Sequence, residues 1–410
     1  MSNKELERFI KSLSEKDVLI YFGCGEIGAR TAKRFGAPHW GVDNSPALWG
    51  GSYGDLKDIQ SPESIRSVSS RVKVVVCSAA EGEIKKQLHE LGVSAENIAL
   101  SPYARSIAPA EKLYRLKIKV LLASGGPSSE SPDSGGGLYM LSINGDSVSQ
   151  TKLFGIASHG LVGLDSGNVI ASSDAGLVCL CDQANSVLPY GSLPAGVRPH
   201  GIAWNGSTES LVVVANSHDS LITIDQNGEI INTRPVLRGT RNSGIAFHHI
   251  NDVAYSSGAL YLSMFSFTGS WKSGAYDGGI YAFDAENFEP LGPVVSGASL
   301  PHSVTFKDGD LWFCNSLPGL LTKGDKEFEL AFPTFARGLD FQGNLAVVGA
   351  SRNRNLRDNK LESGTQIREV NSGFYITLMD SGLSRFVALK GLVPEVHAVK
   401  IISVEQSNDE

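Results

Sequence analysis

Polar residues occupy one position in a pattern that returns six times along this 410-residue chain. In each copy a polar residue is followed by a small one and then by alternating apolar positions. The polar residues, called the leading residues below, are His159, His200, Asn251, His302, Arg337 and His397. Neutral imidazoles are good ligands for divalent transition metals such as Zn, Mn or Fe. We therefore predict that the four histidines and Asn251 form a metal site with positions left open for water or substrate.

Arg337 cannot ligate a metal, so it would pair with a carboxylate, phosphate or sulfate on a substrate. His249 lies two residues before Asn251, and a strand would turn both side chains to one face. A metal with an arginine can polarise a carboxylate for proton abstraction, or assist hydrolysis. We expect His249, Arg337 and Tyr276 to be catalytic, although the sequence does not choose a base among His248, Tyr255, Tyr276 and Glu395.

A purely structural interpretation of the leading residues is also open. Each polar side chain could form a hydrogen bond to the backbone at the turn that begins a blade, with no role in binding. Polar groups that converge on one axis are nevertheless costly unless a ligand, an ion or water satisfies them.

The leading residues follow one another at steps of 41, 51, 51, 35 and 60 positions. Self-similarity at about 40–50 residues with period-2 alternation is typical of propeller blades. We predict an all-β six-bladed propeller over residues 113–410, with each leading residue at the start of an innermost strand. Residues 397–404 would pair with the first strands, within 119–143, because closing the ring removes an exposed sheet edge.

Three long loops are expected at the mouth above the leading residues, namely Gly125–Gly136, Phe265–Gly278 and Ser351–Ser372. Long loops in compact domains are often functional. Their polar and aromatic residues include Trp271, Lys272, Tyr276, Arg352, Arg354, Arg357 and Arg368.

Residues 1–112 predict a small Rossmann-like α/β domain. The motif Gly23-x-Gly25-x-x-Gly28 lies between an apolar strand and a helix, where a glycine turn can approach a phosphate. Asp43 ends a second strand and could accept hydrogen bonds from a ribose. The unit is half the size of a full dinucleotide domain, so NAD chemistry is the weakest interpretation. The glycines could also serve only to pack the helix on the strand.

The segments YFGCGEIGARTAKRF, GVDNSPALWGG and VVVCSAAEGEIKKQLHELGVSAENI resemble the small Rossmann-like domain of nucleotide-sugar and glycan-pathway proteins. The resemblance covers about residues 17–105. It implies that Gly23, Gly25, Gly28, Asp43 and Asn44 face a nucleotide or nucleotide-sugar.

The segments HHINDVAY, LPHSVTFKDGDLWFCNS and FARGLDFQGNLAVVGASRNRNL resemble an uncharacterised propeller family of bacterial conserved hypothetical proteins. Its members often accompany sulfotransferase or glycan-synthesis genes. The resemblance covers about residues 117–404, and it implies a propeller in a glycan pathway without naming an activity.

The net charge of −7 offers no basic surplus for a phosphate backbone, so we expect no nucleic-acid partner. No apolar run is long enough for a membrane span, and the five cysteines fit a reducing cytoplasm. We expect a cytoplasmic glycan-pathway protein that binds a metal and an anionic sugar, oligosaccharide or nucleotide-sugar, and acts as a lyase, epimerase or hydrolase. The alternative is a non-catalytic scaffold of glycan assembly with two recognition modules.

Overall fold

The computed structural model describes residues 3–104, 107–181, 186–237, 247–274, 276–352 and 372–405. The chain divides into two compact units, Met1–Lys112 and Leu113–Glu410. No helix among these described residues is long and apolar enough to cross a membrane.

The first unit is a parallel sheet of four strands in the order β2-β1-β3-β4. Its strands are β1 Val18–Phe22, β2 Trp40–Val42, β3 Val72–Val76 and β4 Ile98–Leu100. Its helices are α1 Asn3–Lys11, α2 Glu26–Phe35 and α3 Glu81–Glu90, with short 3-10 turns at Pro46–Leu48, Pro62–Val68 and Ala95–Asn97. The predicted α/β class is therefore confirmed for this unit.

Strand β1 explains why helices cover both faces of this sheet. All five of its residues are buried. Alternate side chains of a strand point to opposite faces, and Ile20 and Phe22 pack with Leu88 of α3. Leu19 and Tyr21 pack on the other face with residues of α1 and α2.

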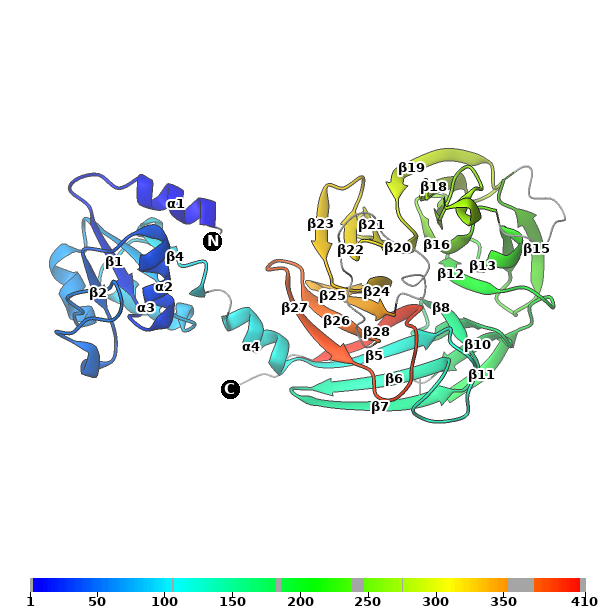
Figure 1. The fold of residues 1–410 in the computed structure, drawn as a ribbon, viewed down its shortest axis with the longest axis horizontal. Coiled ribbons are helices and arrows are strands. Elements are labelled where there is room, and N and C mark those ends of the chain that lie inside the picture. Colours follow the sequence, from blue (N-terminus) through cyan, green and yellow to red (C-terminus); the bar gives the residue numbers. More distant parts are fainter. Residues whose placement is uncertain are drawn as a thin grey trace. The chain divides into compact units, whose positions relative to one another are not determined.

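The second unit is a six-bladed β-propeller, as predicted, with each blade an antiparallel sheet of four strands (Figure 1). Helix α4 Ile107–Arg115 precedes its first strand. From the axis outward, the first three blades are β28 Ala398–Glu405, β5 Lys117–Ser124, β6 Gly137–Asn144 and β7 Ser147–Phe154; β8 Ser158–Gly163, β9 Val169–Ser173, β10 Gly176–Cys181 and β11 Ser186–Gly191; and β12 Pro199–Asn205, β13 Ser210–Ala215, β14 Ser220–Ile224 and β15 Ile230–Pro235.

The other three blades are β16 Ile250–Ser256, β17 Ala259–Met264, β18 Gly278–Asp284 and β19 Pro290–Ala298; β20 Pro301–Lys307, β21 Asp310–Asn315, β22 Leu320–Lys323 and β23 Phe328–Ala331; and β24 Phe335–Gln342, β25 Leu345–Ser351, β26 Gly373–Leu378 and β27 Leu383–Ala388. Short 3-10 turns lie at Asn216–His218 and Trp271–Ser273.

The first blade joins two distant parts of the chain. Strand β28 pairs with β5 in antiparallel register, with Ala398 opposite Ala123 and Val399 opposite Leu122. This pairing closes the ring, so the innermost strands contact one another all the way round the axis. A closed ring leaves no inner edge open to another chain.

The two middle strands of a blade are the most deeply buried. All residues of β13 and β14 are buried, whereas β15 at the rim is mostly exposed. Neighbouring blades pack face to face through apolar clusters, one of which joins Val120 and Leu122 with Val347 and Phe374. This packing holds the innermost strands in place around the axis.

Candidate metal and ligand site on the propeller axis

The leading residues lie where the innermost strands are irregular. A β-bulge interrupts the pairing there in five innermost strands, β8, β12, β16, β20 and β24. A bulge re-aims the side chains of its strand. All six leading residues line a single axial cavity of about 300 Å³.

The glycine after a leading histidine is required by the neighbouring blade. A Cβ on Gly201 would lie 1.9 Å from Oδ1 of Asp252, and a Cβ on Gly160 would lie 2.4 Å from the carbonyl oxygen of His200. The His-Gly pairs therefore let adjacent innermost strands approach closely beside the cavity.

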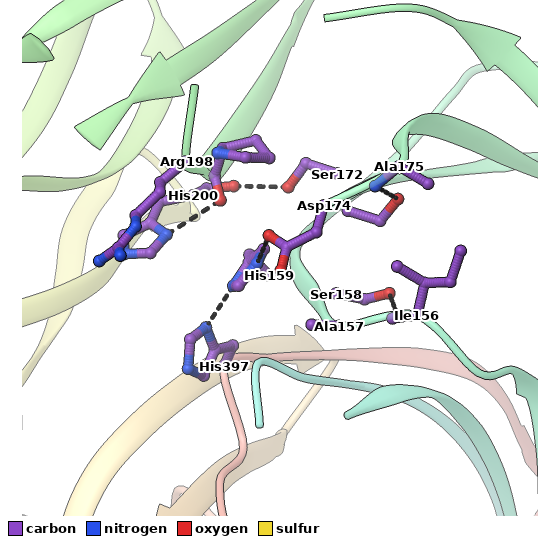
Figure 2. A network of polar contacts seen from close by, with 12 residues as sticks. Ile156, Ala157, Ser158, His159, Ser172, Asp174, Ala175, Arg198, His200 and His397 are labelled. Carbon is purple, nitrogen blue, oxygen red and sulfur yellow. Dashed lines mark hydrogen bonds and ion pairs between the residues drawn. The ribbon is translucent and has the colours of Figure 1, made fainter. Parts of the chain in front are cut away.

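Three histidines from consecutive blades meet on one side of the cavity (Figure 2). They are His159, His200 and His397, called the histidine triad below, and one ring nitrogen from each lies within 4.8 Å of the others. Nitrogens that share one tetrahedral zinc ion lie about 3.3 Å apart, because each bond is about 2.0–2.1 Å. A contraction of at most about 1.5 Å would therefore let the triad hold one ion.

Two carboxylates fix the orientation of the two buried members of the triad. Nε2 of His159 lies 2.9 Å from Oδ1 of Asp174, and Nε2 of His397 lies 2.9 Å from Oε2 of Glu395. An ionised carboxylate only accepts hydrogen bonds, so each Nε2 carries the ring proton and donates it. The hydrogen bond from His159 lowers the pKa of Asp174 below its usual range.

This arrangement brings two lone pairs together. Nδ1 of His159 and Nδ1 of His397 lie only 3.0 Å apart, yet in neutral rings with Nε2–H neither atom has a proton to donate. A cation between or beside them, or one additional proton, is needed to stabilise the contact. Histidine ligands of metals characteristically donate their second nitrogen to a carboxylate, as these two do.

The third member of the triad is also suited to a metal. Nδ1 of His200 donates to the carbonyl oxygen of Pro199 at 2.9 Å, which leaves the Nε2 lone pair available. Burial, reinforced by the positive charge of Arg337, holds the pKa of His200 and of His397 well below the usual value. Neutral imidazole is the form that ligates metals.

A buried ion pair adjoins the triad. Nη1 of Arg337 lies 3.8 Å from the same Glu395 Oε2 that accepts from His397, and the two side chains are 11% and 4% exposed. Asp174, by contrast, is 53% exposed at its side chain. A polar chain thus runs from partly exposed Asp174 through His159 and His397 to buried Glu395 and Arg337.

The other predicted ligands lie across the cavity from the triad. His302 places Nδ1 2.9 Å from the carbonyl oxygen of Leu300 and 2.8 Å from Oγ of Ser316. Its ring packs among aromatic neighbours, with Phe265 at 5.2 Å and Phe335 at 5.5 Å between centroids. His302 is therefore separate from the triad, although it lines the same cavity.

Asn251 also lines the cavity and is 4% exposed. Its Nδ2 donates to the carbonyl oxygen of His249 at 3.1 Å. Its Oδ1 is buried without a hydrogen-bond partner among the described residues. A buried acceptor without a hydrogen bond lowers the stability of the fold. A hydrogen-bond donor on a ligand or a water would therefore be favourable next to Asn251.

The predicted catalytic residues take different positions. Arg337 lines the cavity. The His249 ring lies between Phe265 and Trp271, with centroids 4.3 Å from each, and 6.4 Å from His200. Tyr276 is partly buried against the apolar cluster of Phe265, and neither Tyr276 nor His249 is among the described residues that line the cavity.

Asp252, the residue that follows Asn251, also lines the cavity. Burial raises the pKa of its carboxyl to about 7, although Arg337 and backbone N–H groups of Val253 and Ser303 act in the opposite direction. Asp174 was not identified from the sequence as the partner of His159. The β8–β9 hairpin could have indicated it, because Ser158 pairs with Ser173 and the residue after each of them is therefore close to the other.

Two of the three long loops can be described throughout, apart from Ala275. In Gly125–Gly136, the Lys152 ammonium donates to the carbonyl oxygens of Ser129, Ser131 and Ser134 and fastens the loop. In Phe265–Gly278, Trp271 covers His249. Of the third loop, Arg352 is exposed, and Arg354, Arg357 and Arg368 lie outside the described residues.

The glycine turn of the first unit follows β1, beside the end of β3. A Cβ on Gly23 would lie 2.6 Å from the carbonyl oxygen of Cys77, and one on Gly28 would lie 2.3 Å from that of Gly23. These two glycines are required by packing. A Cβ on exposed Gly25 would meet nothing within 4 Å, so the close approach of a ligand remains an explanation for glycine there.

Asp43 and Asn44 are engaged within the protein. The two carboxylate oxygens of Asp43 accept hydrogen bonds from the N–H groups of Cys24 and Ser45, at 2.7 and 2.8 Å. The Asn44 amide pairs reciprocally with Gln87 of α3. Both residues tie the glycine turn and the end of β2 into the fold, and a ribose would have to compete with these contacts.

The chain belongs to the family described as a domain of unknown function, DUF4915, whose model matches residues 187–408, more than half of the sequence. None of the curated proteins compared with the chain matches it.

Several solved structures match this chain at low identity. The crystal structure of a nidogen/laminin complex matches with 9% identity and a TM-score of 0.48, covering 70% of this chain and 98% of that one. A protein of unknown function from Bacteroides caccae matches with 10% identity and a TM-score of 0.47, covering 69% and 98%. A putative 6-phosphogluconolactonase from Bacteroides fragilis matches with 13% identity and a TM-score of 0.43, covering 70% and 98%. Similarity at such low identity does not indicate a shared activity.

Proposed function

We propose that the propeller axis binds one divalent transition metal ion through His159, His200 and His397. The observation that carries this proposal is the 3.0 Å approach of two Nδ1 atoms whose rings both donate Nε2–H to carboxylates. A shared proton would relieve the same contact, but burial disfavours an added charge on His397. An ion held by three ring nitrogens offsets that cost with ligand bonds, and imidazole suits Zn in particular.

Three protein ligands leave coordination positions open, as in catalytic rather than structural zinc sites. A metal there would polarise a carboxylate or activate water. Arg337 would hold an anionic group of the substrate. His249, whose ring centroid lies 6.4 Å from that of His200, and Tyr276 would take part in proton transfer. The activity that we propose is that of a lyase, epimerase or hydrolase acting on an anionic sugar in a glycan pathway. A metal-free scaffold of glycan assembly is the alternative.

Metal analysis of the purified full-length protein tests the proposal. We expect close to one equivalent of Zn, Mn or Fe per chain, measured by plasma mass spectrometry on protein prepared without a polyhistidine tag. His159→Ala and His397→Ala should each lower the content to background, because each removes one of three ligands. A Co²⁺ titration followed by visible absorption should give a saturable spectrum for the wild-type protein only.

Two other histidines provide matched controls. His218 is exposed at the C-terminal end of a 3-10 turn, and His302 lines the cavity outside the triad. His218→Ala and His302→Ala should both keep the metal. Equal metal content in wild-type protein, His159→Ala and His397→Ala would overturn the triad, and metal-free wild-type protein that ignores added Co²⁺ would favour the scaffold.

A further inference from the structure

The half of the cavity that faces the triad is built from the other three leading residues. Innermost strands contact their neighbours in the order β28, β8, β12, β16, β20 and β24 around a closed ring. The triad comes from the first three of these blades, and Asn251, His302 and Arg337 come from the remaining three. A ligand bound to a metal on the triad would therefore meet Asn251 and Arg337.

Arg337 makes the facing half attractive to an anion. Its positive charge acts on His200, His302, His397 and Asp252, residues drawn from four other blades, so the charge is felt across the whole cavity. A guanidinium has five N–H donors in a planar fork that matches a carboxylate.

Charge balance indicates how much negative charge the ligand brings. A divalent metal and Arg337 carry three positive charges, and Asp174 and Glu395 carry two negative ones. Asp340 and Lys400 also line the cavity, but they pair with each other at 3.0 Å and cancel. An ionised Asp252 would lower the sum further, so at most one positive charge remains, which fits a monoanionic carboxylate better than a dianionic phosphate ester or a nucleoside diphosphate.

Asn251 adds a requirement for a donor. Its Oδ1 is an acceptor that no described residue satisfies, in a side chain that is 4% exposed on the cavity wall. A ligand hydroxyl would satisfy it, whereas an alkyl chain would not.

The cavity volume limits the size of the ligand. Its volume of about 300 Å³ lies at the lower end of the range for ligand pockets. Since one water takes up about 30 Å³ of liquid, this space corresponds to about ten waters, or to a molecule with a comparable number of non-hydrogen atoms. A nucleotide-sugar has several times as many non-hydrogen atoms, so the cavity cannot enclose it.

We propose that the axial cavity binds a monoanionic polyhydroxy carboxylate of monosaccharide size, with the carboxylate between the metal and Arg337 and a hydroxyl donating to Oδ1 of Asn251. This inference rests on the proposed metal site and narrows its substrate to sugar acids. It also places any nucleotide-sugar outside the propeller axis.

The test is calorimetric titration of the zinc-loaded full-length protein. D-Gluconate or D-glucuronate should bind saturably, at least tenfold more tightly than hexanoate, D-glucose or UDP-glucuronate. Arg337→Met should weaken the binding of the acid at least tenfold while the zinc content stays at one equivalent, and Arg337→Lys should recover part of the affinity. Asn251→Leu should reduce the preference for gluconate over hexanoate.

Each other outcome contradicts the inference. Equal binding of hexanoate and gluconate, equal binding of UDP-glucuronate, acid binding that Arg337→Met leaves unchanged, or no binding of either sugar acid would overturn it. Failure of the metal site is a distinct result. If metal-free protein binds gluconate through Arg337, the metal proposal is wrong and the ligand assignment stands. If zinc-loaded protein binds neither acid, the ligand assignment is wrong and the metal proposal stands.

Discussion

Within the part of the chain that the structure describes, several buried polar side chains at the axis lack the hydrogen-bond partners or ligands that they need. The Nδ1 atoms of His159 and His397 face each other, and Oδ1 of Asn251 lacks a donor among the described residues. Both features cost stability in the absence of a ligand, because buried polar groups in low dielectric need partners. The proposed metal ion and a ligand hydroxyl would offset these costs.

Asp252 makes a pH-dependent contribution that can be isolated. Because burial raises its pKa to about 7, the folded state keeps a proton between about pH 4 and 7 that the unfolded chain has released. The slope of unfolding free energy against pH is then negative for this group, so its contribution falls as pH rises to about 7. His200, His302 and His397, with lowered pKa values, give the opposite slope below their ordinary value of 6.5.

Replacing Asp252 should therefore help most at high pH. Relative to wild type, Asp252→Asn should gain about 2–3 kcal/mol in unfolding free energy between pH 5 and pH 8. Urea unfolding at the two pH values measures this difference. Charged Arg337 of β24 and the Cys314 thiol of β21 also face this carboxyl and are present in both proteins. Asp308→Asn, on the exposed surface, should show no such gain, and an equal effect of Asp252→Asn at both pH values would contradict the assignment.

At the scale of elements, the bulged starts of the innermost strands couple each blade to the next. Gly201 of β12 lies so close to Asp252 of β16 that a Cβ would be 1.9 Å from Oδ1 and 2.5 Å from Cα. The approach of two strands, rather than the conformation of one, requires glycine at this position.

Gly201→Ala should destabilise the protein by about 1–3 kcal/mol, the usual cost of overpacking. Gly206→Ala is the matched control in the same blade, because its nearest non-neighbouring atom would lie 3.5 Å from the new Cβ. Urea unfolding of both variants measures the effect. Equal stability of Gly201→Ala and Gly206→Ala would show that the strands can separate at no cost.

The period and alternation of the sequence were sufficient to predict six blades and the closing strand, because both depend on local pattern. They could not predict which histidines converge. His302 takes the same position in the repeat as His200, yet its ring turns to Leu300 and Ser316, which depends on the bulge and on the neighbouring hairpin. Asp174 escaped notice for the same reason, since hairpin register brought it to His159. In the first unit, the glycine motif did not reveal that Asp43 already binds the N–H group of Cys24.

At the scale of the whole molecule, every residue of the triad lies in the unit Leu113–Glu410. The propeller expressed as residues 113–405 should therefore fold and keep one equivalent of metal, with the same loss in His159→Ala. Metal content and a cooperative thermal transition measure this. A soluble, folded propeller without metal, made from a full-length protein that has it, would show that residues 1–112 contribute to the site.

The closure of the ring determines when the three histidines can come together during synthesis and folding. His159 and His397 are separated by 238 positions and meet only after β28 has joined β5. A chain still being synthesised therefore has at most His159 and His200 of the three proposed ligands. Once bound, the ion would link His397, at the C-terminal end of the propeller, to His159 and His200 in its N-terminal blades. It would stabilise the closed ring, because a ligand that binds only the native state stabilises that state.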